Sequence, residues 1–143
     1  MQIRKWQVSD CNQIAVLEEK CFSDPWSLDM ILSAVKLDNF FGFVICEDEE
    51  IKGYIGATAL FEDGEILLVA VDEELRGNGY GKALVLKANE IMLEKGCERC
   101  FLEVRKSNLP AKACYLSCGF KPIGERRRYY KDGEDAIIME KVL

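Results

Sequence analysis

The sequence predicts an α/β (α+β) fold with a mixed, largely antiparallel central sheet flanked by helices on both faces. Two patterns indicate this fold: three β-rich runs follow one another with hairpin signals between them, and two helical patterns then enclose a further strand. Size is a third observation, because 143 residues, 49% of them hydrophobic, suffice for one buried core and leave no room for a second. We therefore expect one domain over residues 1–143.

The N-terminal elements are short. Residues 3–7 alternate between apolar and polar side chains, as in a strand. Ser9 and Asp10 then offer N-caps for a helix whose apolar side chains recur at helical spacing as far as Cys21. Ser27 is placed to cap a second, shorter helix.

A block of three strands is expected next. Residues 41–46 and 51–61 are β-rich and are joined by the acidic turn at 47–50. Residues 62–64 have the sequence Glu-Asp-Gly, a hairpin signal, and a third β-rich run extends to residue 72. Three adjacent antiparallel strands follow from this pattern.

The pattern then becomes helical. Residues 79–95 carry apolar side chains along one helical face, and Gly96 is placed to end the helix. The remaining elements are a strand over 99–105, a helix over 109–118 and strands over 120–130 and 135–142. The expected order is a strand, two helices, three strands, a helix, a strand, a helix and two strands.

Composition excludes several kinds of function. The chain has 19 Lys and Arg against 25 Asp and Glu, a net charge of −6, and no histidine. The lack of histidine excludes Ser-His-Asp and Cys-His nucleophile pairs, so acid–base chemistry must use Glu, Asp, Tyr, Lys or Cys. The acidic balance argues against nucleic-acid binding and suits a cationic substrate better.

The N-terminal residues have no apolar segment typical of a signal peptide. No uncharged run in the chain approaches the length of about 20 residues that spans a bilayer. We therefore expect a cytoplasmic protein without a membrane partner.

Seven cysteines raise the alternatives of a disulfide framework or a metal site. Their number is odd, and most have apolar neighbours. Cys97 and Cys100 with Cys114 and Cys118 loosely resemble four zinc ligands, but the first pair enters a strand pattern and the second lies one turn apart on a helix. We expect no metal.

A glycine-rich loop precedes the long helix. Glycines at a helix start let the backbone approach a ligand, and free N–H groups together with the helix dipole attract phosphate. The alternative is a strand-to-helix turn that needs positive φ, which accounts less naturally for three glycines. The spacing fits neither a Walker loop nor a dinucleotide fingerprint. The candidate phosphate-binding residues are Arg76, Gly77, Asn78, Gly79, Tyr80, Gly81 and Lys82.

The pattern Arg76-x-x-Gly79-x-Gly81 resembles the pyrophosphate loop of the GNAT acyl-CoA N-acyltransferases. The segment Leu-Glu-Val-Arg-Lys-Ser-Asn at 102–108 and Asp-Ala-Ile-Ile-Met at 135–139 are similar to the RimI-type ribosomal-protein-alanine N-acetyltransferases, and the resemblance covers nearly the whole chain. It implies the GNAT fold and direct transfer of an acetyl group from acetyl-CoA, the cosubstrate, to the N-terminal alanine of a ribosomal protein.

Two side chains are candidates for proton transfer. Glu103 shares a strand face with Phe101 and Arg105, where a carboxylate is either functional, paired with Arg105 or solvated at a sheet edge. The resemblance implies that it is the proton acceptor. Tyr115 alone would be read as a core tyrosine, but the resemblance implies that it donates a proton to the departing thiolate.

The resemblance also implies binding residues. Asn108, by pattern only a helix N-cap, matches a residue that bonds the pantetheine arm. The backbone of Val69, Ala70 and Val71 would pair with pantetheine, with the amide near Val71 polarising the acetyl carbonyl, although a buried strand would show the same residue types. The residues expected to flank the acceptor groove are Trp26, Tyr129 and Tyr130.

Other functions remain open at this level. Cys114 or Cys118 could carry the acetyl group in a two-step route. The acceptor could be a small amine or a protein lysine, although the lower pKa of an α-amine, near 8, favours an N-terminus. A non-catalytic acyl-CoA-binding module would need the glycine loop but neither Glu103 nor Tyr115.

Overall fold

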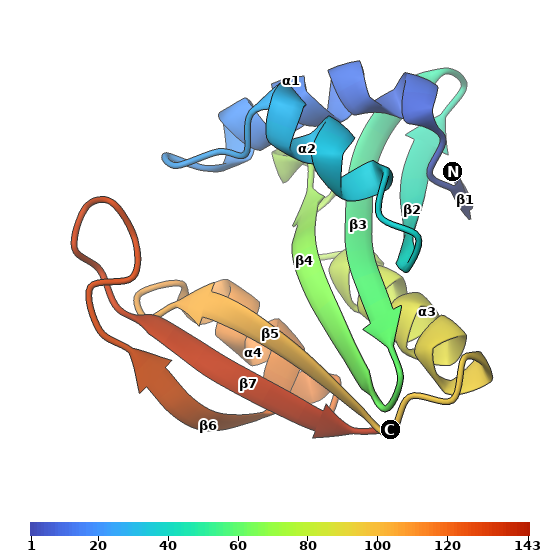
Figure 1. Ribbon diagram of the computed structural model, residues 1–143. Helices are drawn as coiled ribbons and strands as arrows, with labels where there is room; N and C mark the ends of the chain where they lie inside the picture. The colour runs from blue at the N-terminus through green and yellow to red at the C-terminus, as the bar shows by residue number, and fades with distance from the viewer.

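The computed structural model describes residues 1–143, and its strands and helices occur in the expected order (Figure 1). Two short 3₁₀ turns, Val8–Asp10 and Glu73–Leu75, are additional. None of the helices combines the length and the apolar character that a bilayer span requires. The strands are β1 Gln2–Lys5, β2 Phe40–Glu47, β3 Glu50–Leu60, β4 Asp63–Val71, β5 Arg99–Arg105, β6 Lys121–Arg126 and β7 Ala136–Val142, and the helices are α1 Cys11–Cys21, α2 Leu28–Val35, α3 Tyr80–Glu94 and α4 Leu109–Ser117.

The local signals account for most element boundaries. Ser27 caps α2 as expected, with its Oγ accepting from the backbone N–H of Met30 at 3.2 Å. The expected strand over 120–130 is wrong beyond Arg126. The chain turns there because Arg128 takes a left-handed φ of 52° and its N–H donates to the Asp135 carboxylate at 2.9 Å.

The seven strands form one sheet in the order β1-β2-β3-β4-β5-β7-β6. Every neighbouring pair is antiparallel except β4 and β5. These two strands run parallel and pair only where residues 63–65 of β4 face residues 99–101 of β5. Beyond these residues the two strands diverge, so the sheet opens into a V between them (Figure 1).

Strand β4 also carries a bulge. Its register against β3 shifts between the pairs Leu68–Gly56 and Ile66–Ala57, which leaves Leu67 as an extra residue. Because of this extra residue, Ile66 and Leu68, although two positions apart, belong to hydrophobic clusters on opposite faces of the sheet.

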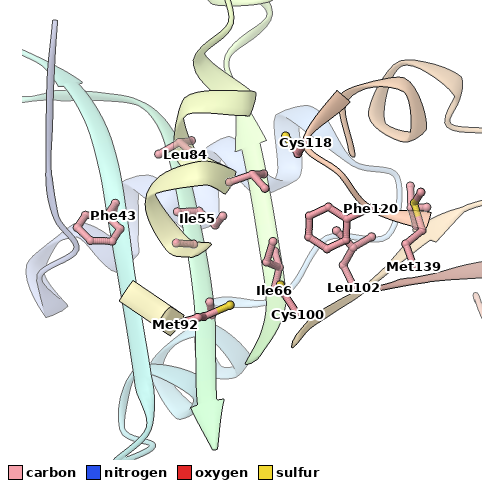
Figure 2. Close-up of a cluster of buried hydrophobic side chains, with 14 of the residues drawn as sticks. Phe43, Ile55, Ile66, Leu84, Met92, Cys100, Leu102, Cys118, Phe120 and Met139 are labelled. Carbon is pink, nitrogen blue, oxygen red and sulfur yellow. The ribbon is translucent and has the colours of Figure 1, made fainter. Parts of the chain in front are cut away.

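The helices cover both faces, as expected. The larger cluster joins α3 to the sheet through Leu84 and Met92 and continues past Leu102 to Phe120 and Met139 under β5 and β7 (Figure 2). The smaller cluster packs α1 and α2 on the opposite face, around the fully buried Tyr54 of β3. The larger cluster spans both arms of the V, because it joins Ile66 of β4 to Leu102 of β5, whereas the smaller cluster belongs to the β1–β4 arm alone.

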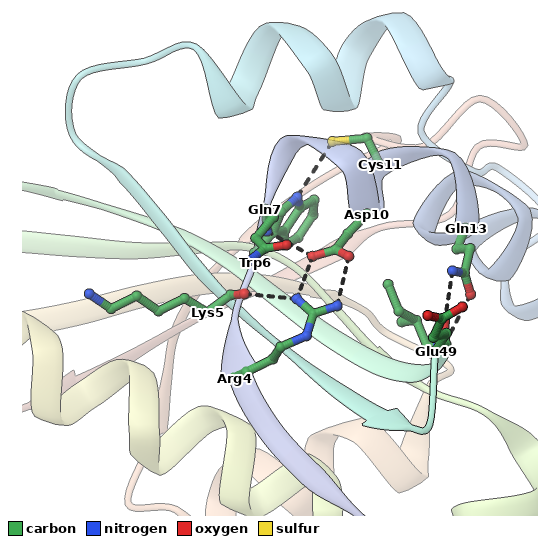
Figure 3. A network of polar contacts seen from close by, with 9 residues as sticks. Arg4, Lys5, Trp6, Gln7, Asp10, Cys11, Gln13 and Glu49 are labelled. Atoms are coloured by element: carbon green, nitrogen blue, oxygen red, sulfur yellow. Dashed lines mark hydrogen bonds and ion pairs between the residues drawn. The ribbon is translucent and has the colours of Figure 1, made fainter.

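Polar contacts tie the N-terminus to α1. The Arg4 guanidinium bonds both carboxylate oxygens of Asp10 at 2.8 and 2.9 Å, and the Gln7 N–H donates to the same carboxylate at 2.7 Å (Figure 3). Although burial opposes it, Arg4 holds the pKa of Asp10 below its usual range. Gln13 of α1 bonds Glu49 and Ile51 at the turn between β2 and β3.

Gly42 of β2 offers a test of how closely the sheet packs. A Cβ atom there would lie 2.7 Å from the Ile55 carbonyl oxygen and 2.8 Å from Cε3 of Trp6. We expect Gly42→Ala to lower the free energy of unfolding in urea by about 1–3 kcal/mol, a typical cost of overpacking. Gly124→Ala is the control, since its Cβ would meet nothing closer than 3.9 Å. Equal stability of the two variants would contradict the close packing.

Candidate active site

A cavity of about 160 Å³ lies where β4 and β5 separate. Both arms of the V line it, through residues 66–69 of β4 and residues 102–105 of β5. A second, more open hollow of about 680 Å³ shares Leu67, Leu102 and Glu103 with it. Six of the side chains expected at the site line the smaller cavity: Trp26, Val69, Glu103, Asn108, Tyr115 and Tyr130.

Three other expected residues lie beside this cavity without lining it. Ala70 and Val71 continue β4 past the lining, and Val71 reaches the glycine loop, where a Cβ on Gly81 would lie 4.0 Å from its Cγ2. Tyr129 is exposed and packs edge-on against Tyr130, with ring centroids 5.2 Å apart. Backbone contacts of Ala70 and Val71 with a ligand therefore stay a prediction.

Glu103 lies near the middle of β5, with its side chain 24% exposed. Its Oε1 forms an ion pair with the Arg126 guanidinium, 2.9 Å from Nε. The alternative pairing with Arg105 is wrong, because Arg105 bonds Asp132 at 2.8 Å and Glu134 at 3.0 Å in the β6–β7 loop. The edge position holds locally, since β4 has already diverged at Glu103 and β5 pairs there with β7 alone.

Arg126 is a site residue that the sequence did not reveal. It belongs to a run of three arginines that reads most simply as a solvated face. Its approach to Glu103 depends on the register of β5, β7 and β6, in which Ile138 pairs with both Glu103 and Gly124. The register of three paired strands cannot be predicted from the residues around Arg126 in the sequence.

The Glu103 carboxylate affects the acidic groups beside it. Burial and the negative charge of Glu103 raise the pKa of Glu65 on β4, while Arg126 opposes this rise. Burial and Glu103 likewise raise the pKa of Tyr129, whose ring centroid lies 5.7 Å from the Arg126 guanidinium carbon. Glu65 and Glu103 thus line the larger hollow together with Arg126, whose charge is opposite to theirs.

Tyr115 projects from α4 into the cavity. Its ring packs edge-on against Phe120 with centroids 6.0 Å apart, and burial raises the pKa of its phenol. The phenol therefore keeps its proton at neutral pH. Asn108 caps the same helix, as its Oδ1 accepts from the Ala111 N–H at 3.2 Å, so the cap also fixes where α4 starts.

The glycine loop presents open backbone to solvent. Gly77 and Gly79 take left-handed φ values of 82° and 81°, with no atom within 4 Å of a Cβ at either position, whereas Gly81 does not need positive φ. The N–H groups of residues 77–82 donate to no backbone or side-chain acceptor; the first bonded one is that of Ala83. Arg76 turns away and donates to the Val71 carbonyl at 3.1 Å.

The loop between α1 and α2 forms a further wall, of which sequence reasoning found only Trp26. It contributes Phe22 and Asp24 beside Trp26, and Glu18 at the end of α1 lines the cavity beneath it. A signal existed, because Glu18 follows Ile14 by four residues and so places a carboxylate on the apolar face of its helix.

Comparison with known proteins adds the family. The chain matches the Acetyltransferase (GNAT) family over residues 6–120. It is 34% identical, over 139 residues, to a Bacillus subtilis protein named for ribosomal protein bS18-alanine N-acetyltransferase activity, and the match covers 96% of this chain and 92% of that relative.

Solved structures have the same fold. The ribosomal-protein-S18-alanine N-acetyltransferase of Escherichia coli superposes with a TM-score of 0.90 at 28% identity, covering 99% of this chain and 92% of the other. A chain of the NatC complex bound to Gag peptide and CoA gives a TM-score of 0.87 at 23% identity, covering 100% of this chain and 99% of its own. The second likeness concerns the fold alone.

The open N–H groups of the glycine loop can be tested with one substitution. We expect Gly79→Asp to weaken CoA binding at least about tenfold, equivalent to 1.4 kcal/mol, because it puts negative charge where phosphate would meet the N–H groups. Calorimetry with CoA measures this. Gly133→Asp is the matched control, with the same charge at a φ of 89° in the β6–β7 loop. Unchanged CoA affinity in Gly79→Asp would refute the loop assignment.

Proposed function

The chain belongs to the Acetyltransferase (GNAT) family and is an acetyl-transferring enzyme, and we propose that it acetylates the N-terminal alanine of a ribosomal protein by direct transfer from acetyl-CoA. One observation carries the proposal: Glu103 and Tyr115 come from separate elements to line one cavity between the diverging strands. The name of the Bacillus subtilis relative supports the choice of acceptor.

Residues on the α3 side fit the cosubstrate. A pyrophosphate would be held by the free N–H groups of residues 77–82 at the N-terminus of the 15-residue helix α3, where Gly77 and Gly79 leave the space beside the backbone open. Val69 and Asn108 would line the path of the pantetheine arm. When bound, acetyl-CoA supplies an activated acetyl thioester.

Glu103 is suited to take the proton of the acceptor amine. Its carboxylate lies in the cavity wall, and the ion pair with Arg126 fixes its position. An α-amine with a reference pKa near 8 gives up this proton more easily near pH 7 than a lysine with a pKa near 10.4. The site therefore favours an N-terminus over a lysine side chain.

Tyr115 is suited to supply a proton to the departing sulfur. Because burial raises the pKa of its phenol, the donor stays protonated until the thiolate, with a reference pKa near 8.5, develops.

The cysteine route has less support. Burial and the neighbouring Cys118 raise the pKa of Cys114 to about 11, so little nucleophilic thiolate is present.

The acceptor can be identified in cells. We expect one ribosomal protein that begins with alanine to lose its N-terminal acetyl group when this protein is deleted, and to regain it with the wild-type chain but not with Glu103→Gln. Mass spectrometry of intact ribosomal proteins measures this. N-termini that do not change on deletion would refute the ribosomal acceptor.

The role of Glu103 can be tested with its amide. We expect Glu103→Gln to bind acetyl-CoA normally and to lose about 10²- to 10⁴-fold in kcat/KM, the usual effect of a missing general base. Part of the loss should be recovered above pH 8, where the amine arrives neutral. Glu125→Gln, which removes an exposed carboxylate of β6, is the control. Wild-type activity of Glu103→Gln at pH 7 would show that the carboxylate is structural.

A further inference from the structure

Glu18 is a buried carboxylate that the proposed proton transfers do not use. It lies on α1, is only 3% exposed, and lines the same cavity as Glu103 and Tyr115. Buried carboxylates are costly unless they are paired or serve a ligand. Glu18 therefore requires an explanation from its surroundings.

Its two protein contacts are both hydrogen-bond donors. The Tyr54 hydroxyl donates to Oε1 at 2.6 Å, and the Trp26 backbone N–H donates to Oε2 at 2.9 Å. Both oxygens thus act as acceptors, as in an ionised carboxylate. Burial raises the pKa of Glu18, and these two donors oppose the rise.

Glu18 lacks a cationic partner in the protein. No Lys or Arg lies within ion-pair distance of Glu18, whereas each of the other charged side chains lining this cavity has an oppositely charged partner. Those pairs are Glu103 with Arg126, Asp24 with Lys131, and Arg105 with Asp132 and Glu134. Glu18 is consequently the one acidic or basic side chain of the cavity wall without an ion-pair partner.

We propose that Glu18 binds the ammonium group of the acceptor when it enters the cleft. This inference rests on the proposed function, in which the acceptor is an N-terminal amine. An ammonium brings the one kind of charge that the wall lacks and has three donors for the free lone pairs of the carboxylate. The ammonium group then passes a proton to Glu103, whose carboxylate is already paired with the Arg126 guanidinium.

The two carboxylates therefore have different tasks. Glu18 attracts the charged amine. The charged amine is the form that binds, whereas the neutral amine is the form that reacts. An interaction made with the ground state alone lowers KM and kcat together and leaves kcat/KM unchanged. Glu103 acts on the proton itself, so its loss lowers kcat.

The groups that face Glu18 are few. Tyr54 of β3 and Cys21 of α1 are the titratable neighbours, and burial raises the pKa of both. Neither ionises below pH 8, so a change in acceptor binding near pH 8 reports on the amine.

Glu18→Gln separates the charge from the contacts. The amide oxygen can accept from the Trp26 N–H, and the amide NH₂ can donate to the Tyr54 oxygen, so the anchor of the α1–α2 loop is kept. Glu19→Gln is the matched control, because it removes the adjacent, exposed carboxylate of the same helix. Thermal unfolding of both variants checks that the fold is intact.

The probe is a synthetic peptide that begins with alanine, with acetyl-CoA saturating. At pH 7 we expect Glu18→Gln to raise the peptide KM about tenfold, the factor that corresponds to 1.4 kcal/mol, with kcat equal to or above that of the wild type and Glu19→Gln unchanged. Above the pKa of the amine the difference in KM should disappear, because a neutral amine is not attracted. An unchanged KM, or a raised KM that persists at high pH, would overturn the proposal and leave Glu18 a structural anchor.

Binding provides a readout independent of turnover. Calorimetry on the CoA-loaded protein should show that the wild type binds the free-amine peptide more tightly than the same peptide with an acetylated N-terminus, and that Glu18→Gln loses this preference. A wild type that shows the preference but acetylates no alanine peptide would refute the proposed function and retain the inference. Equal binding of both peptides by the wild type would refute the inference.

Discussion

The short parallel pairing of β4 and β5 is the constraint on which the site depends. The two strands share only three residue pairs, at residues 63–65 and 99–101, and each then follows its own antiparallel neighbour. A sheet that stayed paired over its whole width would have no interior opening. Because the strands separate, residues from the middle of the sheet line a cavity, while the larger buried cluster joins the two arms behind it.

Where the arms separate, polar groups lose their partners in the neighbouring strand. Leaving these groups without any partner would cost free energy. In the arm of β5, β6 and β7 the polar side chains are paired within the protein: Glu103 forms an ion pair with Arg126, and Asn108 caps the helix that carries Tyr115. The glycine loop differs, since the N–H groups of residues 77–82 have no protein acceptor at all. The polar groups left without a protein partner therefore lie where a phosphate-bearing ligand fits.

Predictions from the sequence were correct where the determining residues are close together in the chain, and they failed where the determining contacts join distant residues. Hydrophobic period and capping residues predicted the order of strands and helices, and the strand over 99–105 has the expected bounds, because these signals lie within a few residues of one another. The end of β6 at Arg126 was missed because a contact between Arg128 and Asp135 turns the chain. The pairing of Glu103 with Arg126 was missed because it needs the register of three strands.

The rim of the cleft differs physically from its floor. The floor is formed by β4 and β5 and is held by the buried clusters, whereas the rim consists of the α1–α2 and β6–β7 loops, which belong to opposite arms. One ion pair spans these loops, between Lys131 Nζ and Asp24 Oδ1 at 3.7 Å, with the two side chains 90% and 31% exposed. Exposed pairs of this kind contribute little to stability. Loss of this pair would therefore cost the fold little, whereas the Trp26 backbone bond to Glu18 ties one of the two loops to the buried part of α1.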